Sequence, residues 1–338
     1  MAGLRESVNQ RDQAEISRCG DGSARGNCLK KNARPTLENL PTEQLNPSSS
    51  DLDLKSSLEI AQIINSEDAT VAGVVGRALP QIARGIDWIT DALARGGRLI
   101  YVGTGTSGRI AALDASESPP TFNVSPKTVQ FVMAGGERAL SRAVEADEDS
   151  RELGIREMRK KKPGKKDVVV GIAASGRTPF TVAAVEYARQ AGAKTIGLSC
   201  NPGSPLERAA ELGIVVETGP EVVSGSTRMK AGTAEKLVLN MLSTGAMVKL
   251  GYVYGNLMVN LHQKNTKLTE RAITIVARAL DTSREQAREA LQRAGRDVPV
   301  AIVMAKAGVS RKAAQKLLND ARGHVRNAIA AAQAATKP

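Results

Sequence analysis

The sequence predicts an α/β protein with a doubly wound, parallel, five-stranded sheet flanked by helices. Two observations carry this prediction: five short apolar segments typical of strands, and helical patterning between most of them. The segment 167–173 is nearly all apolar, as a strand buried on both faces should be. Helices should precede the sheet, and a small all-helical domain should follow it.

Each element follows from its own pattern. Apolar residues recur at helical spacing over about 54–94, which predicts two or three helices before the first strand. Beyond about residue 267 the pattern is helical throughout, with Pro299 and Gly308 as breaks. The expected strands are 98–103, 128–133, 167–173, 194–199 and 214–218, and the expected helices include 181–190, 206–212 and a long one over 233–251.

Three regions are predicted along the chain. Residues 1–35 are polar and show no sustained period, so we expect a disordered or poorly ordered extension. Residues 36–266 should form the sheet domain together with its N-terminal helices. Residues 267–338 should form the helical C-terminal domain.

The positive charge lies at the two ends of the chain. The net charge is +12, but residues 1–35 carry 7 Lys/Arg against 4 Asp/Glu, and residues 267–338 carry 14 against 6. The 231 residues between them carry 26 against 25 and are nearly neutral. With one Trp, four Tyr and three Phe, stacking platforms for single-stranded nucleic acid are scarce. We therefore expect no nucleic-acid partner.

Composition also bounds the compartment and the cofactors. No apolar run reaches the roughly 18 residues that a membrane span needs, and the N-terminus has no apolar signal-peptide core. Three cysteines without metal-ligand spacing argue against a disulfide framework, and two histidines argue against a histidine-rich metal site. We expect a cytoplasmic protein without a histidine-rich metal site.

Three loops rich in Gly, Ser and Thr could bind an anion. They span 103–109, 174–179 and 224–233, and each opens a predicted helix, where free N–H groups and hydroxyls can meet a phosphate. The first lacks the Gly-Lys-Ser/Thr ending of a Walker A loop and favours a monophosphate, so a nicotinamide site is a minor alternative. The candidate binding residues are Thr104, Thr106, Ser107, Ser175, Gly176, Arg177, Thr178, Ser226, Thr227, Arg228 and Lys230.

Two glutamates are candidate acid–base groups. Glu117 stands two residues before Pro119, and we expect Pro119 to end the helix that begins near Ser107. Glu148 belongs to an acidic cluster that follows a helical stretch. Either carboxyl could carry a proton transfer, and a solvated loop or helix end is the alternative for both.

Four stretches together resemble the N-acetylmuramic acid 6-phosphate etherases, lyases with a sugar isomerase (SIS) domain. They are YVGTGTSGRIAALDASESPPTF at 101–122, VVVGIAASGRTPF at 168–180, TGPEVVSGSTRMKAGTAEKLVLNMLST at 218–244 and VYGNLMV at 253–259. The resemblance covers roughly 36–335 and implies an SIS-type sheet. Where the family has Gly-Ala before its second acid, this chain has Ala146 and Asp147.

The resemblance implies cleavage of the D-lactyl ether of N-acetylmuramic acid 6-phosphate. The products would be N-acetylglucosamine 6-phosphate and D-lactate, formed by elimination and then hydration during cell-wall amino-sugar recycling. The two family acids fall on Glu117 and Glu148. The resemblance also suggests a homodimer, and it implies no metal or redox cofactor.

Helix geometry adds an expectation of its own. Ser107 and Glu117 are about 15 Å apart along a helix, too far for one hexose phosphate to reach both easily. Either the phosphate is held mainly by 175–178, or Glu117 and the first loop act on ligands of different subunits. The second option requires a dimer with sites near the subunit interface.

Two rival functions remain open on the same fold. A sugar-phosphate isomerase would share the phosphate loops and an enolising carboxylate. A sugar-phosphate-sensing regulator, similar to the vertebrate glucokinase regulatory protein, would bind the ligand without catalysis. The presence of both Glu117 and Glu148 favours an enzyme over a sensor.

Overall fold

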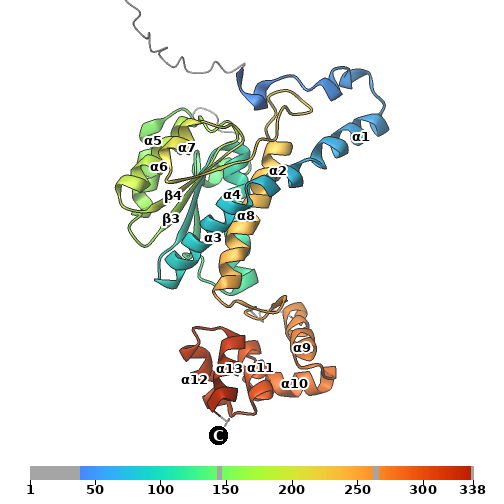
Figure 1. Ribbon diagram of the computed structural model, residues 1–338, viewed down its shortest axis with the longest axis vertical. Coiled ribbons are helices and arrows are strands. Elements are labelled where there is room, and N and C mark those ends of the chain that lie inside the picture. Colours follow the sequence, from blue (N-terminus) through green and yellow to red (C-terminus); the bar gives the residue numbers. More distant parts are fainter. Residues whose placement is uncertain (1–38, 143–146, 262–265, 336–338) are drawn as a thin grey trace, which may run out of the picture. The chain divides into compact units, whose positions relative to one another are not determined.

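The structure is a computed structural model that describes residues 39–142, 147–261 and 266–335. The predicted extension over 1–35 lies outside the described residues. The central sheet has five parallel strands in the order β2-β1-β3-β4-β5 (Figure 1). Its strands are β1 (Leu99–Gly103), β2 (Val129–Met133), β3 (Val168–Ile172), β4 (Lys194–Ser199) and β5 (Leu212–Val215). The predicted fold class is confirmed.

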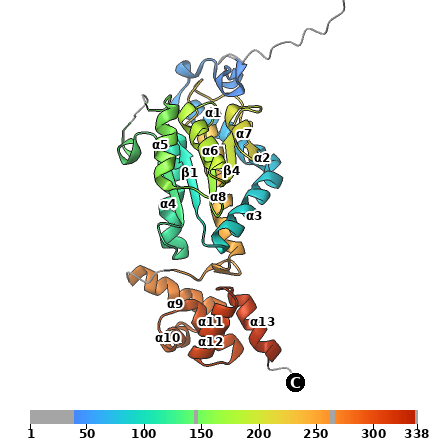
Figure 2. The ribbon, with the colours of Figure 1, turned by 90° about the vertical axis from the view of Figure 1, so that its left-hand side faces the viewer.

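Helices cover both faces of this sheet. One apolar core lies between alternate strand residues and the helices α2 (Val71–Arg77), α3 (Leu79–Ala94), α4 (Gly105–Phe122) and α8 (Lys230–Lys249). A second core lies on the other face, under α5 (Arg151–Lys161), α6 (Pro179–Gln190) and α7 (Pro205–Ala209) (Figures 1 and 2). Burial on both faces explains why β1 and β3 read as unbroken apolar runs.

The N-terminal part consists of short turns and one helix with no buried residue. Single 3₁₀ turns lie at Pro41–Glu43, Pro47–Ser49 and Leu52–Leu54, and another follows β2 at Gly136–Leu140. Helix α1 (Ser57–Asp68) begins at a capping box between Ser56 and Glu59. None of its side chains is buried, and Leu58 is 68% exposed. Leu58 is thus a large apolar side chain that the chain itself leaves exposed.

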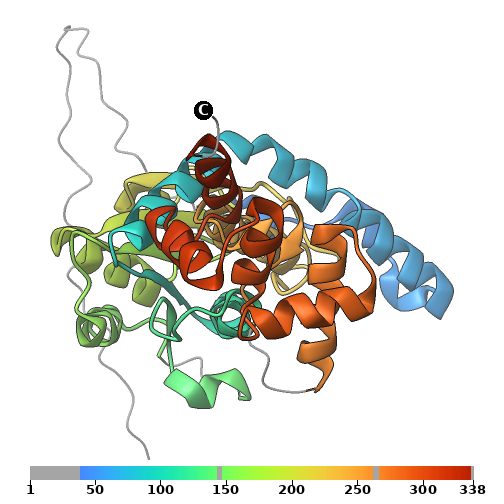
Figure 3. The same ribbon diagram turned by 90° about the horizontal axis from the view of Figure 1, so that it is seen from below.

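The C-terminal region contains five helices around a separate apolar core, shown from orange to red in Figure 3. They are α9 (Thr266–Leu280), α10 (Arg284–Arg293), α11 (Val298–Ala307), α12 (Arg311–Asp320) and α13 (Val325–Ala335). Pro299 lies in the first turn of α11 and Gly308 caps its end in the left-handed conformation, as the breaks predicted. A two-stranded hairpin, β6 (Val253–Tyr254) and β7 (Leu257–Met258), precedes them and was not predicted.

The end of α4 differs from the expectation. The helix does not stop before Pro119 but continues through both prolines to Phe122, and Asn123 ends it with φ 57°. A proline removes one helix hydrogen bond, but its φ is already helical. The Asn123 N–H bonds Pro119 O at 2.9 Å and closes the last turn. Glu117 is therefore within a continuous helix and not at its C-terminal end.

A smaller error concerns the residues around β5. The expected helix 206–212 ends at Ala209, and β5 begins at Leu212 rather than at Ile214. Leu212 is apolar and buried in either setting, so periodicity over so short a run could not separate the two.

Candidate active site

The topology places two of the three loops side by side. From β1 the chain crosses to β2 on one side, and from β3 it crosses to β4 on the other, so β1 and β3 flank the point where the strand order reverses. Ligands of open α/β sheets bind in the crevice at the carboxyl ends of such strands. Loop 103–109 follows β1 and loop 174–179 follows β3, so both border this crevice.

The first loop presents the N-terminus of α4. Thr104 is the N-cap residue, and its side chain makes no capping hydrogen bond. Gly103 cannot be replaced without a clash, since a Cβ there would lie 3.0 Å from Gly108 N and 3.1 Å from Ile172 O. Ser107 is buried, and its Oγ is hydrogen-bonded at 2.8 Å to Glu235 Oε1. Thr106 is half-buried and lies in the first turn of α4.

The second loop turns tightly on Gly176. This residue has φ 65°, and a Cβ would lie 2.4 Å from Ser204 Oγ. The Ser175 hydroxyl accepts a hydrogen bond from Arg177 N at 3.2 Å. Thr178 is the N-cap of α6 and makes no side-chain cap; the next residue, Pro179, has no N–H group, and the Phe180 N–H is already bonded to a backbone carbonyl.

Glu148 lies between the first two loops. Its carbonyl accepts a hydrogen bond from Phe180 N, at the start of α6, at 3.0 Å. Its carboxylate lies next to Gly105, where a Cβ would stand 3.2 Å from Glu148 Oε1. Glu148 is half-buried. The structure thus brings a carboxylate to the open N-terminus of α4, beside the switch-point crevice.

Glu117 does not join this group within one chain. It is exposed and stands ten residues after Ser107 on the same helix. Ten residues correspond to a rise of about 15 Å along the axis. Loop 103–109 and Glu148 therefore lie at one end of α4, and Glu117 lies more than two turns along it.

The third loop is organised differently from the expectation. The carboxylate of Glu221 accepts hydrogen bonds from Lys230 N at 2.9 Å and from Ala231 N at 3.0 Å, at the start of α8. The loop pattern predicts that these two N–H groups bind a phosphate, but they are already hydrogen-bonded to Glu221. The sequence pattern missed this cap because Glu221 stands nine residues before the helix, beyond the range of a local capping motif.

Lys230 also has a partner already. Its Nζ lies 2.6 Å from a carboxylate oxygen of Glu67, and its side chain is only 4% exposed. Helix α1 supplies Glu67, so this ion pair fastens α1 to the start of α8. Ser226 and Thr227 are half-buried and Arg228 is exposed in the segment before α8. A Cβ on Gly232 would lie 3.4 Å from Thr106 Cγ2, so the start of α8 adjoins the first loop.

Two buried carboxyl groups were not singled out from the sequence. Asp114 accepts hydrogen bonds from the Tyr101 hydroxyl at 2.8 Å and the Ser243 hydroxyl at 3.0 Å, and burial raises its pKa. Glu235 lies on α8, and burial raises its pKa to about 8. Both stand in mixed helical stretches, where the sequence carries no sign that a carboxyl will face inward.

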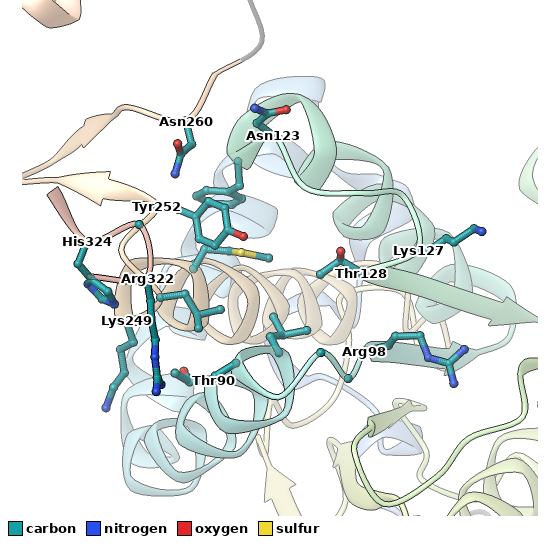
Figure 4. A pocket seen from close by; sticks show the side chains of 18 residues that line it. Thr90, Arg98, Asn123, Lys127, Thr128, Lys249, Tyr252, Asn260, Arg322 and His324 are labelled. Carbon is teal, nitrogen blue, oxygen red and sulfur yellow. The ribbon is translucent and has the colours of Figure 1, made fainter. Parts of the chain in front are cut away.

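A large cavity lies away from these loops. It measures about 900 Å³, and Figure 4 shows Arg98 and Thr128 on its wall. Arg98 immediately precedes β1 and Thr128 immediately precedes β2, so the cavity belongs to the amino ends of the strands. Arg98 is paired with Asp167 at 2.7 Å. By topology, the switch-point loops are the better candidate site despite the size of this cavity.

Within 39–142, 147–261 and 266–335, no three His, Cys, Asp or Glu side chains are grouped so that they could hold a metal ion. In the same ranges, no helix has the length and apolar character to cross a membrane.

Comparison with known proteins decides the family. Residues 81–189 match the glucokinase regulatory protein N-terminal SIS domain, and residues 154–245 match the SIS domain. The chain is 51% identical over 293 residues to the N-acetylmuramic acid 6-phosphate etherase of Escherichia coli, covering 87% of this chain and 98% of that one. The chain belongs to the N-acetylmuramic acid 6-phosphate etherase family.

Other etherases match over the same span. Identity is 49% to an etherase of Vibrio cholerae, over 87% of this chain and 98% of that protein, and 47% to one of Clostridium beijerinckii, over 87% and 96%. Nearly the whole length of each etherase is therefore represented here. The resemblance drawn from the four stretches is confirmed, and the sheet domain contains an SIS domain.

Proposed function

We propose that this etherase cleaves the D-lactyl ether of N-acetylmuramic acid 6-phosphate with water. The products are N-acetylglucosamine 6-phosphate and D-lactate, and the reaction serves amino-sugar recycling from the cell wall in the cytoplasm. The observation that carries the proposal is the position of Glu148. Its carboxylate lies beside Gly105 at the open N-terminus of α4, so a proton acceptor and a phosphate-binding helix end border one crevice.

The phosphate is held by the first two loops. The backbone N–H groups at the start of α4 carry no side-chain cap and suit a phosphate dianion. Thr104, Thr106, Ser107, Ser175 and Thr178 supply further polar groups, and Arg177 supplies a cation. Ser226, Thr227 and Arg228 reach the ligand from the segment before α8. Lys230 acts through its ion pair with Glu67 and holds α1 in place.

The chemistry consists of proton transfers, the loss of lactate and the addition of water, with no redox step. Opening of the sugar ring gives an aldehyde at C1, which acidifies the proton on C2. A carboxylate removes this proton, the C3–oxygen bond breaks, and a carboxylic acid protonates the departing lactate oxygen. Water then adds to C3 of the unsaturated aldehyde, and a proton returns to C2. Glu117 and Glu148 supply the acid and the base.

Both glutamates act in one site only if two subunits share it. Glu148 borders the loops of its own chain, whereas Glu117 lies more than two turns along α4. We infer a homodimer in which Glu117 of one subunit faces the crevice of the other. The uncovered apolar side chains Leu45, Leu54 and Leu58, which are 82%, 81% and 68% exposed, support a partner surface at the N-terminal part.

The test is a lactate assay. Purified protein is incubated with N-acetylmuramic acid 6-phosphate, and D-lactate is measured enzymatically, with Glu117→Gln and Glu148→Gln beside the wild type. We expect lactate from the wild type and at least a hundredfold less from each variant. An absence of lactate from a wild type that still binds the sugar phosphate would overturn the etherase proposal in favour of a sensor or an isomerase.

A further inference from the structure

A buried carboxyl group lies directly behind the first phosphate loop. Glu235, on α8, is 1% exposed, and its Oε1 lies 2.8 Å from the Oγ of Ser107. Ser107 is itself buried and stands in the first turn of α4, next to the residues that face the crevice. Helices α4 and α8 pack against each other (Figure 1). The pair therefore links the phosphate loop to the core helix behind it.

Among the described residues, no cation contributes to the pKa of Glu235. Ser107 of α4 is hydrogen-bonded to its carboxyl, and the Cys200 thiol after β4 interacts with it electrostatically; Thr218 and Glu221, after β5, interact with that thiol. Burial raises the pKa of the Cys200 thiol, so the thiol is neutral. The carboxylate of Glu221 accepts hydrogen bonds from the N–H groups of Lys230 and Ala231. Burial raises the pKa of Glu235 to about 8, and the hydrogen bond from Ser107 lowers it only in part.

The second oxygen of Glu235 determines where the proton must lie. Among the described residues, Oε2 is buried and has no hydrogen-bond partner. A proton on Oε2 would be a buried donor without an acceptor, and an ionised Oε2 would be a buried charge without a donor. A proton on Oε1 avoids both, because it points at Ser107 Oγ. The hydroxyl hydrogen of Ser107 is then free to turn toward the crevice.

We propose that Glu235 is a positioning residue: as a neutral carboxylic acid it donates its proton to Ser107 Oγ, so that Ser107 donates its own hydrogen to the substrate's phosphate. Ionised Glu235 reverses this arrangement. It takes the hydroxyl hydrogen of Ser107 for itself, which leaves only an oxygen lone pair facing the phosphate, and it adds a negative charge behind the loop. The inference rests on the proposed function only in taking a sugar phosphate as the ligand.

The test compares ligand binding and turnover between pH 7 and 9.5. The second ionisation of a phosphate monoester lies near pH 6, so the ligand keeps one charge state in this range. The dissociation constant of N-acetylglucosamine 6-phosphate is measured by calorimetry, and KM and kcat are measured with N-acetylmuramic acid 6-phosphate. The variants are Glu235→Gln, Glu235→Leu, Ser107→Ala and the double variant Ser107→Ala/Glu235→Gln.

Glu235→Gln keeps a donor toward Ser107 but cannot ionise. We expect its dissociation constant at pH 7 to stay within about threefold of the wild type. Above pH 8 the wild-type constant should rise up to about tenfold per pH unit, whereas that of Glu235→Gln should stay flat. Glu235→Leu should raise KM about tenfold at every pH with little change in kcat, because Ser107 loses its partner. The double variant should bind no worse than Ser107→Ala alone.

Asp114→Asn is the matched control. Asp114 is another carboxyl group whose pKa burial raises, but its partners are Tyr101 and Ser243 rather than the first loop. It should leave the pH dependence of binding as in the wild type. Equal alkaline weakening in the wild type and Glu235→Gln would overturn the proposal, and so would full-strength binding by Ser107→Ala. A wild-type protein that binds the sugar phosphate but releases no lactate would contradict the proposed etherase function and not the role of Glu235.

Discussion

Ser107 and Glu117 lie on one uninterrupted helix, α4, where Ser107 is buried against α8 and Glu117 is exposed. Their separation of about 15 Å along the helix axis is the rise of ten helical residues. In the proposed site, a hexose phosphate bound at the first loop would contact Glu148 of its own chain and would need Glu117 from another chain.

Mixing two inactive variants tests this sharing. A dimer of one Glu117→Gln subunit and one Glu148→Gln subunit has one site with both glutamates, if the two residues come from different subunits. Random reassociation of equal amounts should then restore about a quarter of wild-type lactate release. The measurement is the lactate rate after unfolding and co-refolding of the mixture.

The control is the same procedure on each variant alone, which should stay inactive. If both residues act within one chain, every site in the mixture lacks one glutamate. A mixture as inactive as its components, with heterodimers verified by mass spectrometry of tagged subunits, would contradict a shared site.

Glu221→Ala should destabilise the sheet domain. Its carboxylate accepts the N–H groups of Lys230 and Ala231, and both become buried donors without an acceptor when it is removed. The expected loss in the free energy of unfolding is about 1–3 kcal/mol, measured by urea denaturation. Glu217→Ala is the control because Glu217 is exposed in the same connection. Equal stability of the two variants would refute the capping role.

Stability should depend on pH through Glu235. Burial raises its pKa from 4.5 to about 8, so between these values the unfolded chain has lost a proton that the folded protein keeps. The free energy of unfolding contributed by this group is then greatest below about pH 4.5 and falls as pH rises to about 8. Glu235→Gln lacks this loss. From pH 5.5 to 8.5 the wild-type Tm should fall relative to the Tm of Glu235→Gln. If the two Tm values change in parallel with pH, Glu235 does not contribute to the pH dependence of stability.

Two glycine variants distinguish backbone strain from a steric clash: Gly176→Ala in the second loop, and Gly203→Ala in the turn after β4. Both glycines have φ 65°, but a Cβ would lie 2.4 Å from Ser204 Oγ at Gly176 and would meet nothing within 4 Å at Gly203. Gly203→Ala should cost about 1–2 kcal/mol of stability and leave KM unchanged. Gly176→Ala should cost more and raise KM as well, because the loop must shift. Equal KM values in the lactate assay would argue against a role of this loop in binding.

Leu58→Glu should weaken the dimer. Leu58 is 68% exposed on α1, a helix with no buried residue, and a charge there would be desolvated in an interface. Gln62→Glu places the same charge at another exposed position of α1 and is the control. Light scattering at falling protein concentration should show Leu58→Glu dissociating first, with lactate release falling alongside. Unchanged masses for both variants would exclude this face from the interface.

The sequence determined the parts of this protein that depend on local pattern. Apolar runs of strand length marked all five strands, helical spacing marked the flanking helices, and Gly-rich turns marked the loops at the strand ends. Two local rules failed. Pro119 did not end α4, because its fixed φ suits the last turns of a helix, and the short run before Leu212 did not distinguish helix from strand.

Relationships between distant residues were decided by the tertiary structure alone. The carboxylate of Glu221 accepts hydrogen bonds at the start of α8, nine residues later in the chain. Lys230 forms an ion pair with Glu67, 163 residues away, and Glu235 is hydrogen-bonded to Ser107, 128 residues away. A sequence states which groups can donate or accept a proton, but not which of them lose their water on folding. Burial is a property of packing, and burial makes Glu235 a neutral acid behind the phosphate loop.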